Sequence, residues 1–291
     1  MSVRLRYAVV TPARDDAADL ARLAESVTAQ TILPQTWVIV DNGSTDRTAG
    51  VAADVAAAHS WVRTLEIPGE AAPRRGAPIV RAFMAGVDSI GPLPEVVVKL
   101  DADVTTDPDY FERLLTVFAS DGRLGIAGGI CWELQDGSWR PQHTTRDHVR
   151  GAARAYRREC LEDVLPLVER VGWDGIDELR AQTHGWRVRS IDDLVVRHYR
   201  SLGVREPRLS KWIEQGDMAH FMGYRSSYLL ARAAYRALRD PSALAMVYGY
   251  WRAVLRRSPR YEDPDVRRLL QVEQSWRRLP RRIREALGRI S

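Results

Sequence analysis

A short apolar run that ends abruptly in two acids constrains the fold of this chain more than any other feature. Three valines, Lys99 and Leu100 lead directly into Asp101-Ala102-Asp103. A continuous Val/Leu run is typical of a strand that is buried on both faces, as in a parallel sheet. If the strand geometry persists, Asp101 and Asp103 point to the same side and can converge on one hard cation at the carboxyl edge of the sheet. Two acids that merely solvate a turn are the simpler alternative.

The first half of the chain alternates apolar runs with helical patterns. We expect strands at 7–11, 37–41, 62–67 and 96–100, and helices at about 15–30, 46–59 and 78–87 and after Asp107. Asp107 is expected to cap that last helix, with Pro108 at the favoured first position. Further strands are expected at 124–133 and 187–191. Repeated strand–helix units predict an α/β fold, with a mixed, mostly parallel sheet flanked by helices.

The C-terminal third differs from the rest in both charge and pattern. Residues 206–291 contain 18 Lys and Arg against 9 Asp and Glu, whereas residues 1–205 contain 25 against 29. From Lys211 onward the pattern is helical, with breaks expected at Asp240-Pro241 and Asp263-Pro264. We therefore predict a first domain over 1–205 and an Arg-rich helical region over 206–291.

Cysteine content and hydropathy indicate the compartment. The two cysteines, Cys131 and Cys160, form neither a disulfide framework nor a metal cluster, which favours a reducing environment. The apolar run before Pro12 is too short for a signal peptide, and no stretch approaches the roughly 18 apolar residues of a spanning helix. We expect a cytoplasmic protein, either free or peripheral on the inner face of the membrane.

A third acid follows the second predicted strand. Asp41 precedes Asn42-Gly43-Ser44-Thr45-Asp46, in which Asn-Gly favours a tight turn and Ser44 or Thr45 can cap the next helix. An acid at a strand end can accept a hydrogen bond from a nucleotide base or a ribose hydroxyl. Plain turn-and-cap chemistry is the structural alternative. Neither of the two common glycine-rich phosphate-binding patterns occurs in the chain.

Taken in order, these motifs resemble those of inverting family 2 glycosyltransferases, bacterial polysaccharide or glycolipid sugar transferases with the GT-A fold. The resemblance rests on Thr11-Pro12, on Asp41-Asn42-Gly43-Ser44 and on Asp101-Ala102-Asp103, and it continues through 151–158 and 172–188. It covers roughly residues 5–200. Between Pro73 and Gly86 the chain departs from the family pattern, because Arg75-Gly76 fits but Met84 stands near the usual Asn position.

The resemblance implies a site for a nucleotide-diphosphate sugar, which would be a UDP-, GDP- or dTDP-sugar. The residues implied in donor binding are Thr11, Pro12, Arg14, Asp41, Arg75, Asp101 and Arg200. A Mn²⁺ or Mg²⁺ ion would be held by Asp103, with Asp101 either on the ribose or on the same ion and with His198 as a third ligand. A packing or surface histidine is the alternative for His198.

The resemblance also implies a carboxylate base at the start of the helix that contains Leu179-Arg180-Ala181. Members of the family often have Glu-Asp there, and the alignment puts Asp174 at the aspartate and Trp173 where Glu is usual. Asp177, one helical turn later, is the second candidate. A helix cap at Asp174 and a first-turn acid at Asp177 are the structural alternatives. Trp173 could stack on a sugar, although a buried tryptophan is commoner.

The combined prediction is a metal-dependent inverting glycosyltransferase acting on a hydroxyl of a glycan, a glycolipid or a small glycoside. A sugar-nucleotide-forming nucleotidyltransferase is the nearest alternative, but residues 11–15 are not the glycine-rich basic loop of such enzymes. A non-catalytic protein that binds membrane or nucleic acid has no use for the ordered carboxylates, and no nucleic-acid partner is expected. For the helical segments 219–239 and 242–257, packing on the first domain and peripheral contact with a membrane both remain open.

Overall fold

The computed structural model describes residues 5–69, 76–135, 137–142, 147–199 and 208–275. The chain forms two compact units, Met1–Ser201 and Leu202–Ser291. The first unit contains the sheet and all of the acids predicted for the site. The second unit is helical.

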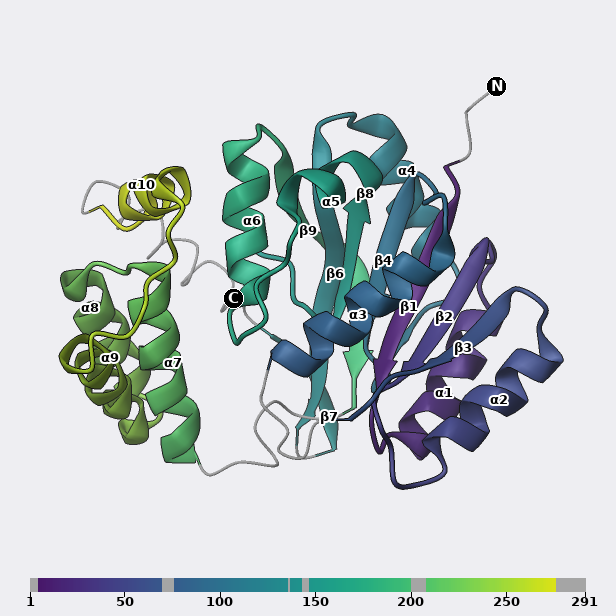
Figure 1. Ribbon diagram of the computed structural model, residues 1–291, viewed down its shortest axis with the longest axis horizontal. Coiled ribbons are helices and arrows are strands. Elements are labelled where there is room, and N and C mark those ends of the chain that lie inside the picture. Colours follow the sequence, from purple (N-terminus) through teal and green to yellow (C-terminus); the bar gives the residue numbers. More distant parts are fainter. Residues whose placement is uncertain (1–4, 70–75, 136, 143–146, 200–207, 276–291) are drawn as a thin grey trace. The chain divides into compact units, whose positions relative to one another are not determined.

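A nine-stranded sheet forms the centre of the first unit, as Figure 1 shows. Its spatial order is β3-β2-β1-β4-β8-β6-β9-β5, with β7 paired to β6. The strands are β1 (Tyr7–Ala13), β2 (Thr36–Asp41), β3 (Val62–Glu66), β4 (Val96–Leu100), β5 (Val104–Thr106), β6 (Leu124–Gln135), β7 (Ser138–Pro141), β8 (Ala153–Arg157) and β9 (Arg187–His198). β1 to β4 are parallel, as are β6 and β9, whereas β8 is antiparallel to both of its neighbours. The predicted α/β fold with a mixed, mostly parallel sheet is confirmed.

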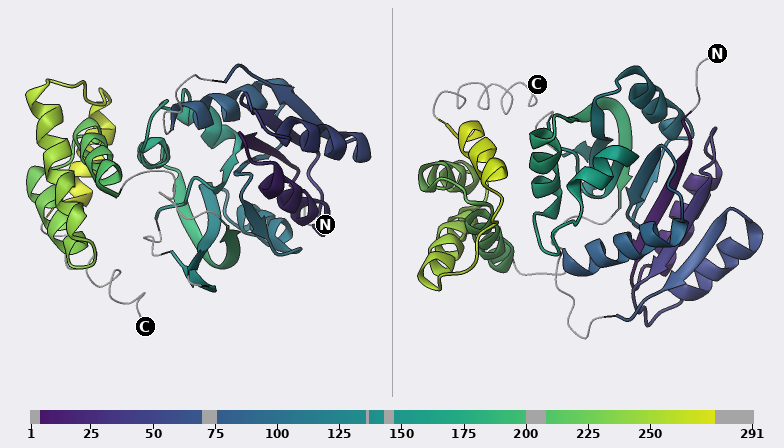
Figure 2. Two further views of the ribbon diagram at one scale, coloured as in Figure 1. Left: turned by 90° about the horizontal axis from the view of Figure 1, so that it is seen from below. Right: turned by 45° about the horizontal axis from the view of Figure 1, so that its top comes forward.

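Helices cover both faces of this sheet (Figures 1 and 2). One hydrophobic core includes residues of α1 (Ala17–Thr28), α2 (Thr48–Ala58) and α4 (Tyr110–Ser120). The other includes residues of α3 (Ala77–Ile90), α5 (Arg158–Val164) and α6 (Trp173–Thr183). In β4, Val96 and Val98 belong to the first core and Val97 to the second. This strand is apolar without interruption because both of its faces are buried.

The predicted start of the fourth helix is wrong. α4 begins at Tyr110 with Asp109 at its N-cap position, not with Asp107 as the cap and Pro108 as the first residue. The carboxylate of Asp107 instead accepts a hydrogen bond of 2.7 Å from Nη1 of Arg197 on β9. This long-range ion pair takes up the carboxylate that capping would have used.

Strand β8 is absent from the sequence prediction because its residues, Ala-Arg-Ala-Tyr-Arg, have little apolar character. It lies between β4 and β6 at the centre of the sheet, and Arg154 within it is fully buried. A buried arginine requires internal acceptors and anions. The partners that satisfy it come from α6, whose contacts are described below.

The second unit consists of α7 (Arg208–Met222), α8 (Ser226–Ala237), the 3₁₀ turn η1 (Pro241–Leu244), α9 (Ala245–Leu255) and α10 (Pro264–Glu273). Side chains of Asp240 and Asp263 cap η1 and α10 just before their prolines, which confirms both predicted breaks. The continuous helix expected over 219–239 is wrong. The chain turns at Gly223, whose φ of +81° is readily adopted by glycine.

Two glycines allow α7 and α9 to pack at close range. A Cβ atom on Gly216 would lie 2.0 Å from the carbonyl oxygen of Met246, and one on Gly249 would lie 2.0 Å from that of Ile213. Side chains at these positions would force the helices apart. With a core built from Ala219, Leu229, Met246 and Tyr250, the second unit packs around its own interior. None of the described helices is both long and apolar enough to cross a membrane.

Candidate functional site

The carboxyl ends of β1, β2 and β4 meet at one edge of the sheet. Ala13 pairs with Asp41 across β1 and β2, and Val10 pairs with Lys99 across β1 and β4. Open α/β sheets bind their ligands at this edge. β4 ends at Leu100 and β5 begins at Val104, so Asp101 and Asp103 lie in the short connection and not in a strand. The topology therefore brings the three predicted acids to the same edge.

Hydrogen bonds fix the loops that follow β1 and β2. Asp41 is 8% exposed, and its carboxylate accepts hydrogen bonds from the backbone N–H and the hydroxyl of Ser44. The carboxylate of Asp15 accepts a hydrogen bond of 2.7 Å from the N–H of Thr45. Ser44 and Thr45 are thus engaged within the loops, and the prediction that one of them caps α2 is wrong, since Arg47 occupies that position.

The residues around Thr11 differ in what they can offer a ligand. The hydroxyl of Thr11 is fully buried and accepts a hydrogen bond of 2.9 Å from Nε1 of Trp37 in the core. Nη1 of Arg14 is buried and has no hydrogen-bond partner among the described residues. A buried N–H without an acceptor is costly, and an anionic or carbonyl oxygen would satisfy it. Arg75 and Arg200 lie outside the described residues.

The structure brings Asp103 and His198 together. β5 pairs with β9 so that Val104 is opposite His198, and Nε2 of His198 lies 3.3 Å from Oδ2 of Asp103. Burial by itself would lower the pKa of His198. The hydrogen bond and the negative charge of Asp103 outweigh that effect, so the pKa is raised above its usual value. Because the two residues are about 95 positions apart in the chain, only strand pairing could place them in contact.

Sequence reasoning missed a further acid beside His198. Glu133 on β6 is 7% exposed and pairs with His198 in the register of β6 and β9, and its charge also raises the pKa of His198. An acid inside an otherwise apolar strand is the signal that could have revealed it. Within the described ranges, no three His, Cys, Asp or Glu side chains are arranged to hold a metal ion by themselves. The pair formed by Asp103 and His198 offers one carboxylate and one imidazole, a donor set that suits Mn²⁺.

Asp101 has a different partner from Asp103. Its Oδ1 atom contacts the ammonium group of Lys99, which is 1% exposed. The same ammonium group donates a hydrogen bond of 2.6 Å to the carbonyl oxygen of Gly151. Asp101 itself keeps 26% of its side chain exposed. Lys99 was not among the predicted site residues, although a lysine within a valine strand is a visible exception.

Asp174 is half-buried in the first turn of α6, close to these groups. Gly172, with a φ of +86°, occupies the N-cap position, so Asp174 does not cap the helix. A Cβ atom built on Gly151 would lie 3.5 Å from Oδ2 of Asp174 and 3.0 Å from the ring of Trp173. Since the carbonyl of Gly151 accepts a hydrogen bond from Lys99, this backbone segment connects Asp174 with the pair formed by Lys99 and Asp101.

Asp177 belongs to a buried network on the inner side of α6. It is 2% exposed and accepts hydrogen bonds of 2.9 Å from Nη2 of Arg154 and 2.5 Å from the hydroxyl of Tyr156. Burial raises the pKa of Asp177 to about 7, and the charge of Arg154 opposes this rise. Arg154 also donates to the carboxylate of Glu178 and to the carbonyl oxygen of Asp174. The network fixes the first turn of α6 to the sheet.

Trp173 is a core residue and not an exposed platform for a sugar. It is 6% exposed, and the charged groups of Lys99 and Arg154 each lie 5.6 Å from its ring centroid. An aromatic face attracts cations at such distances. The ring is therefore engaged by two buried cations, which leaves it no open face for stacking.

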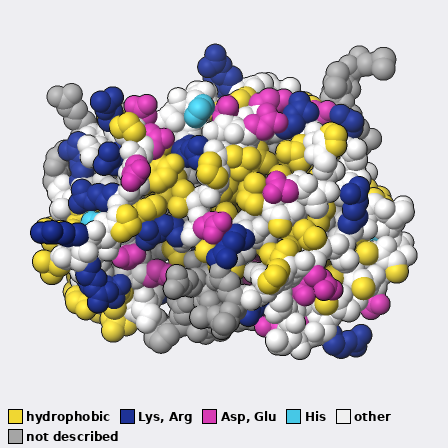
Figure 3. Space-filling view, in the orientation of Figure 1, with side chains coloured by type: hydrophobic (Ala, Val, Ile, Leu, Met, Phe, Trp, Pro, Cys, Tyr) yellow, Lys and Arg dark blue, Asp and Glu magenta, His cyan; other side chains and the backbone are white. Residues whose placement is uncertain are grey.

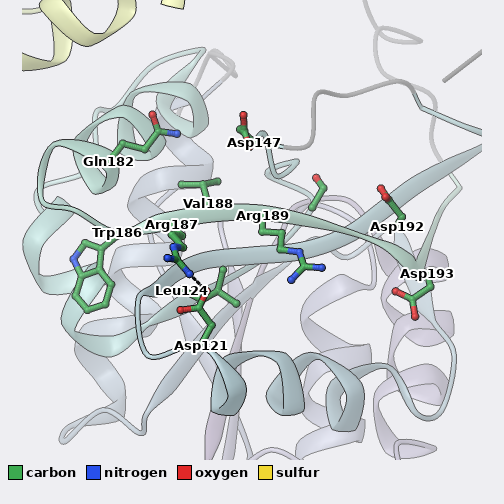
Figure 4. A pocket seen from close by; sticks show the side chains of 11 residues that line it. Asp121, Leu124, Asp147, Gln182, Trp186, Arg187, Val188, Arg189, Asp192 and Asp193 are labelled. Atoms are coloured by element: carbon green, nitrogen blue, oxygen red, sulfur yellow. Dashed lines mark hydrogen bonds and ion pairs between the residues drawn. The ribbon is translucent and has the colours of Figure 1, made fainter. Parts of the chain in front are cut away.

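A separate pocket of about 780 Å³ lies along the first part of β9 (Figure 4). Within it, Arg187 forms an ion pair of 3.0 Å with Asp121. None of the predicted site residues lines this pocket, and His198 stands at the other end of β9. Its acids and arginines lie largely at the surface. The size of this pocket therefore gives no reason to move the candidate site away from the carboxyl edge of the sheet.

The mixed, mostly parallel sheet flanked by helices matches the GT-A fold of solved glycosyltransferase structures. The mannosyltransferase PcManGT from Pyrobaculum calidifontis, in complex with GDP-Man and Mn²⁺, matches with a TM-score of 0.57 and 16% identity over 98% of this chain and 85% of that one. GalNAc-T7 with UDP, GalNAc and Mn²⁺ matches with a TM-score of 0.60 and 13% identity over 83% and 52%. TarS 1–349 of S. aureus with UDP-GlcNAc matches with a TM-score of 0.56 and 15% identity over 74% and 66%. At such identities the likeness shows the fold alone.

The family follows from the sequence match. The model of glycosyl transferase family 2 matches residues 8–230, and the chain belongs to this family. The predicted family and the predicted enzyme class, a glycosyltransferase, are thereby confirmed. A comparison with curated proteins finds no significant match.

Proposed function

We propose that this protein transfers a sugar, with inversion, from a nucleotide-diphosphate donor to a hydroxyl of a glycan, glycolipid or small glycoside. The observation that carries the proposal is the contact between Asp103 and His198 at the sheet edge that also holds Asp41. Asp174 lies against Gly151, whose carbonyl oxygen accepts a hydrogen bond from Lys99, the partner of Asp101. A donor bound at this edge would have its diphosphate near Asp103 and His198 and its sugar near Asp174. Family membership favours this reaction over nucleotidyl transfer and over simple binding.

In this proposal the nucleotide lies over the ends of β1 and β2. Asp41 accepts a hydrogen bond from the base or the ribose, and Thr11 and Pro12 line the pocket. The buried Nη1 atom of Arg14 supports a role for that residue, because the donor offers the oxygen acceptor that the atom lacks. Arg75 and Arg200 remain proposed contacts of the diphosphate side. Nucleotides or nucleotide sugars in the similar structures support a donor of this class.

Asp103 and His198 would hold the divalent ion. When bound, such an ion offsets the negative charge that develops on the leaving diphosphate as the sugar–phosphate bond breaks. An imidazole beside a carboxylate suits Mn²⁺ better than Mg²⁺, which prefers oxygen ligands. Mn²⁺ in two of the similar structures supports a divalent ion in this fold.

Asp174 is the proposed base that takes the proton from the acceptor hydroxyl. A base must be within hydrogen-bond reach of that hydroxyl, and Asp174 is half-buried at the start of α6 near the donor edge. Asp177 is the weaker candidate, because Arg154 and Tyr156 already bond its two oxygens in the interior. We therefore assign Asp177 a structural role, in which it binds α6 to the sheet through Arg154 and Tyr156.

A screen of UDP, GDP and dTDP by thermal unfolding tests this function. One of the three should raise the melting temperature only when Mn²⁺ or Mg²⁺ is present, and EDTA should reverse the effect. A ligand at a hundred times its Kd adds about 2.7 kcal/mol to the free energy of unfolding, which is a readily measured shift. The proposal fails if none of the three nucleotides stabilises the protein with either metal.

We also propose that the second unit contacts an anionic membrane surface. Nine of the twelve exposed large hydrophobic side chains among the described residues lie in this unit. Four of them, Leu244, Tyr248, Trp251 and Leu255, are spaced to lie on one face of η1 and α9 and are 46–83% exposed. Arg252 lies over the ring of Tyr248. Figure 3 shows hydrophobic side chains among Lys and Arg side chains over these helices. Aromatic rings and arginines together suit the headgroup region of a bilayer.

Co-sedimentation with vesicles tests the membrane contact. The full chain should bind vesicles that contain phosphatidylglycerol and should bind phosphatidylcholine vesicles weakly, because the arginines require anionic headgroups. Replacing Tyr248, Trp251 and Leu255 together with serine should remove most of this binding. Leu33→Ser in the first unit, also an exposed apolar residue, is the matched control. Equal sedimentation of the triple variant and the wild type would contradict the proposal.

A further inference from the structure

Lys99 places a buried cation at the centre of the sheet. It pairs in register with Arg154 across β4 and β8, and both side chains are almost completely buried. Like charges directly opposite each other on neighbouring strands are destabilising. Each of the two cations therefore needs an anion or acceptors of its own. The partners that the fold supplies show what each cation does.

The two cations are directed to different acids. Arg154 bonds the carboxylates of Asp177 and Glu178 beneath α6. The ammonium group of Lys99 contacts the carboxylate of Asp101 and donates to the carbonyl oxygen of Gly151. The anionic partner that the structure gives Lys99 is thus one of the two acids that the sequence motif offers to a metal.

We infer that Lys99 is a positioning residue that neutralises Asp101 and withholds it from the metal, which leaves Asp103 and His198 as the protein's ligands. The inference rests on the proposed metal-assisted function. A carboxylate engaged by a buried ammonium group is a poor ligand for a divalent cation, because the ammonium group repels the cation. Asp101 stays partly exposed and can still accept a hydrogen bond from a hydroxyl of the donor.

Lys99 also connects the two halves of the site. The carbonyl of Gly151 that it holds belongs to the backbone against which Asp174 and Trp173 pack. One ammonium group thus fixes both the acid at the donor side and the segment beside the proposed base. An apolar residue at position 99 would leave Asp101 without its cation and the carbonyl of Gly151 without its hydrogen-bond donor.

Binding of Mn²⁺ alone to the full chain, followed by the loss of the free-ion EPR signal, tests the inference. Four proteins are compared: the wild type, Asp103→Asn, Lys99→Met, and Lys99→Met combined with Asp101→Asn. Lys99→Met removes the repelling charge and releases Asp101, so its affinity should rise on the order of tenfold. The double variant has the same net charge at the site as the wild type. Its affinity should therefore stay within about threefold of the wild type, because Asp101 is not a ligand.

The outcomes separate the inference from the proposed function. A wild type that binds no Mn²⁺ overturns the inference, because no ion is then held beside Lys99, whereas the proposed function is decided by the nucleotide screen. If the wild type binds and the double variant loses affinity as strongly as Asp103→Asn, Asp101 is a ligand and only the inference about Lys99 fails. Weaker or unchanged binding by a folded Lys99→Met variant also overturns it. Circular dichroism checks that each variant folds. If Lys99→Met does not fold, the Mn²⁺ affinity of the double variant decides between the outcomes. Replacing both members of a buried ion pair is better tolerated than replacing only one.

Discussion

Asp103→Asn is expected to abolish Mn²⁺-dependent binding of the donor nucleotide. Asparagine keeps the size of the side chain but removes the charge that attracts the cation, while His198 at 3.3 Å is left as a neutral ligand. Mutation of a residue that only hydrogen-bonds to a metal ligand typically lowers the metal affinity by about 10- to 100-fold. Loss of a ligand should exceed that range. Calorimetric titration with the nucleoside diphosphate identified in the thermal screen, with and without Mn²⁺, measures the effect.

Asp193→Asn is the matched control for this experiment. Asp193 is 75% exposed on β9 and pairs with Arg113 at the surface, so its replacement removes the same charge from a position without a proposed ligand role. Its titration curve should match that of the wild type. If Asp103→Asn still binds the nucleotide with Mn²⁺ at near wild-type affinity, the ion is held elsewhere and the site as described is wrong.

Asp174→Asn should leave donor binding intact while turnover falls by roughly 100- to 10,000-fold, the usual contribution of a general base. An amide cannot accept the proton of the acceptor hydroxyl at neutral pH. Because the network around Arg154 bonds the backbone carbonyl of Asp174 and not its side chain, the fold of α6 should be unaffected. Turnover with a suitable acceptor, and nucleotide affinity by calorimetry, are measured on the same preparation.

Asp177→Ala provides the contrast. Its loss leaves Arg154 and Tyr156 without one of their acceptors in the interior, and breaking such a buried pair lowers the free energy of unfolding by about 3–5 kcal/mol. Denaturant unfolding should therefore detect Asp177→Ala and not Asp174→Asn. Near-normal turnover in Asp174→Asn, together with a folded but inactive Asp177→Ala, would move the base to Asp177.

Apolar periodicity predicted β1, β2, β3 and β4 and the helices between them, because strands buried on both faces and amphipathic helices leave local signals. It failed where tertiary contacts replaced local preferences. Asp107 was expected to cap a helix and instead pairs with Arg197, which lies 90 residues further along the chain. β8 has no apolar signal, since its buried arginine is satisfied only by acids from another element.

The sequence alone determined the fold class, the family motifs and the edge of the sheet at which the acids gather. These depend on residues that are close in the chain or on the rule that parallel strands end at a common edge. Only the tertiary structure decided which partner each acid has: His198 for Asp103, Lys99 for Asp101, and Arg154 and Tyr156 for Asp177. Apart from Lys99 and Asp101, these partners are far apart in the chain. Even for that close pair, the sequence does not show that the fold buries Lys99 and so directs its ammonium group to Asp101. The charge of a buried acid is set by what packs against it, and packing is a property of the folded chain.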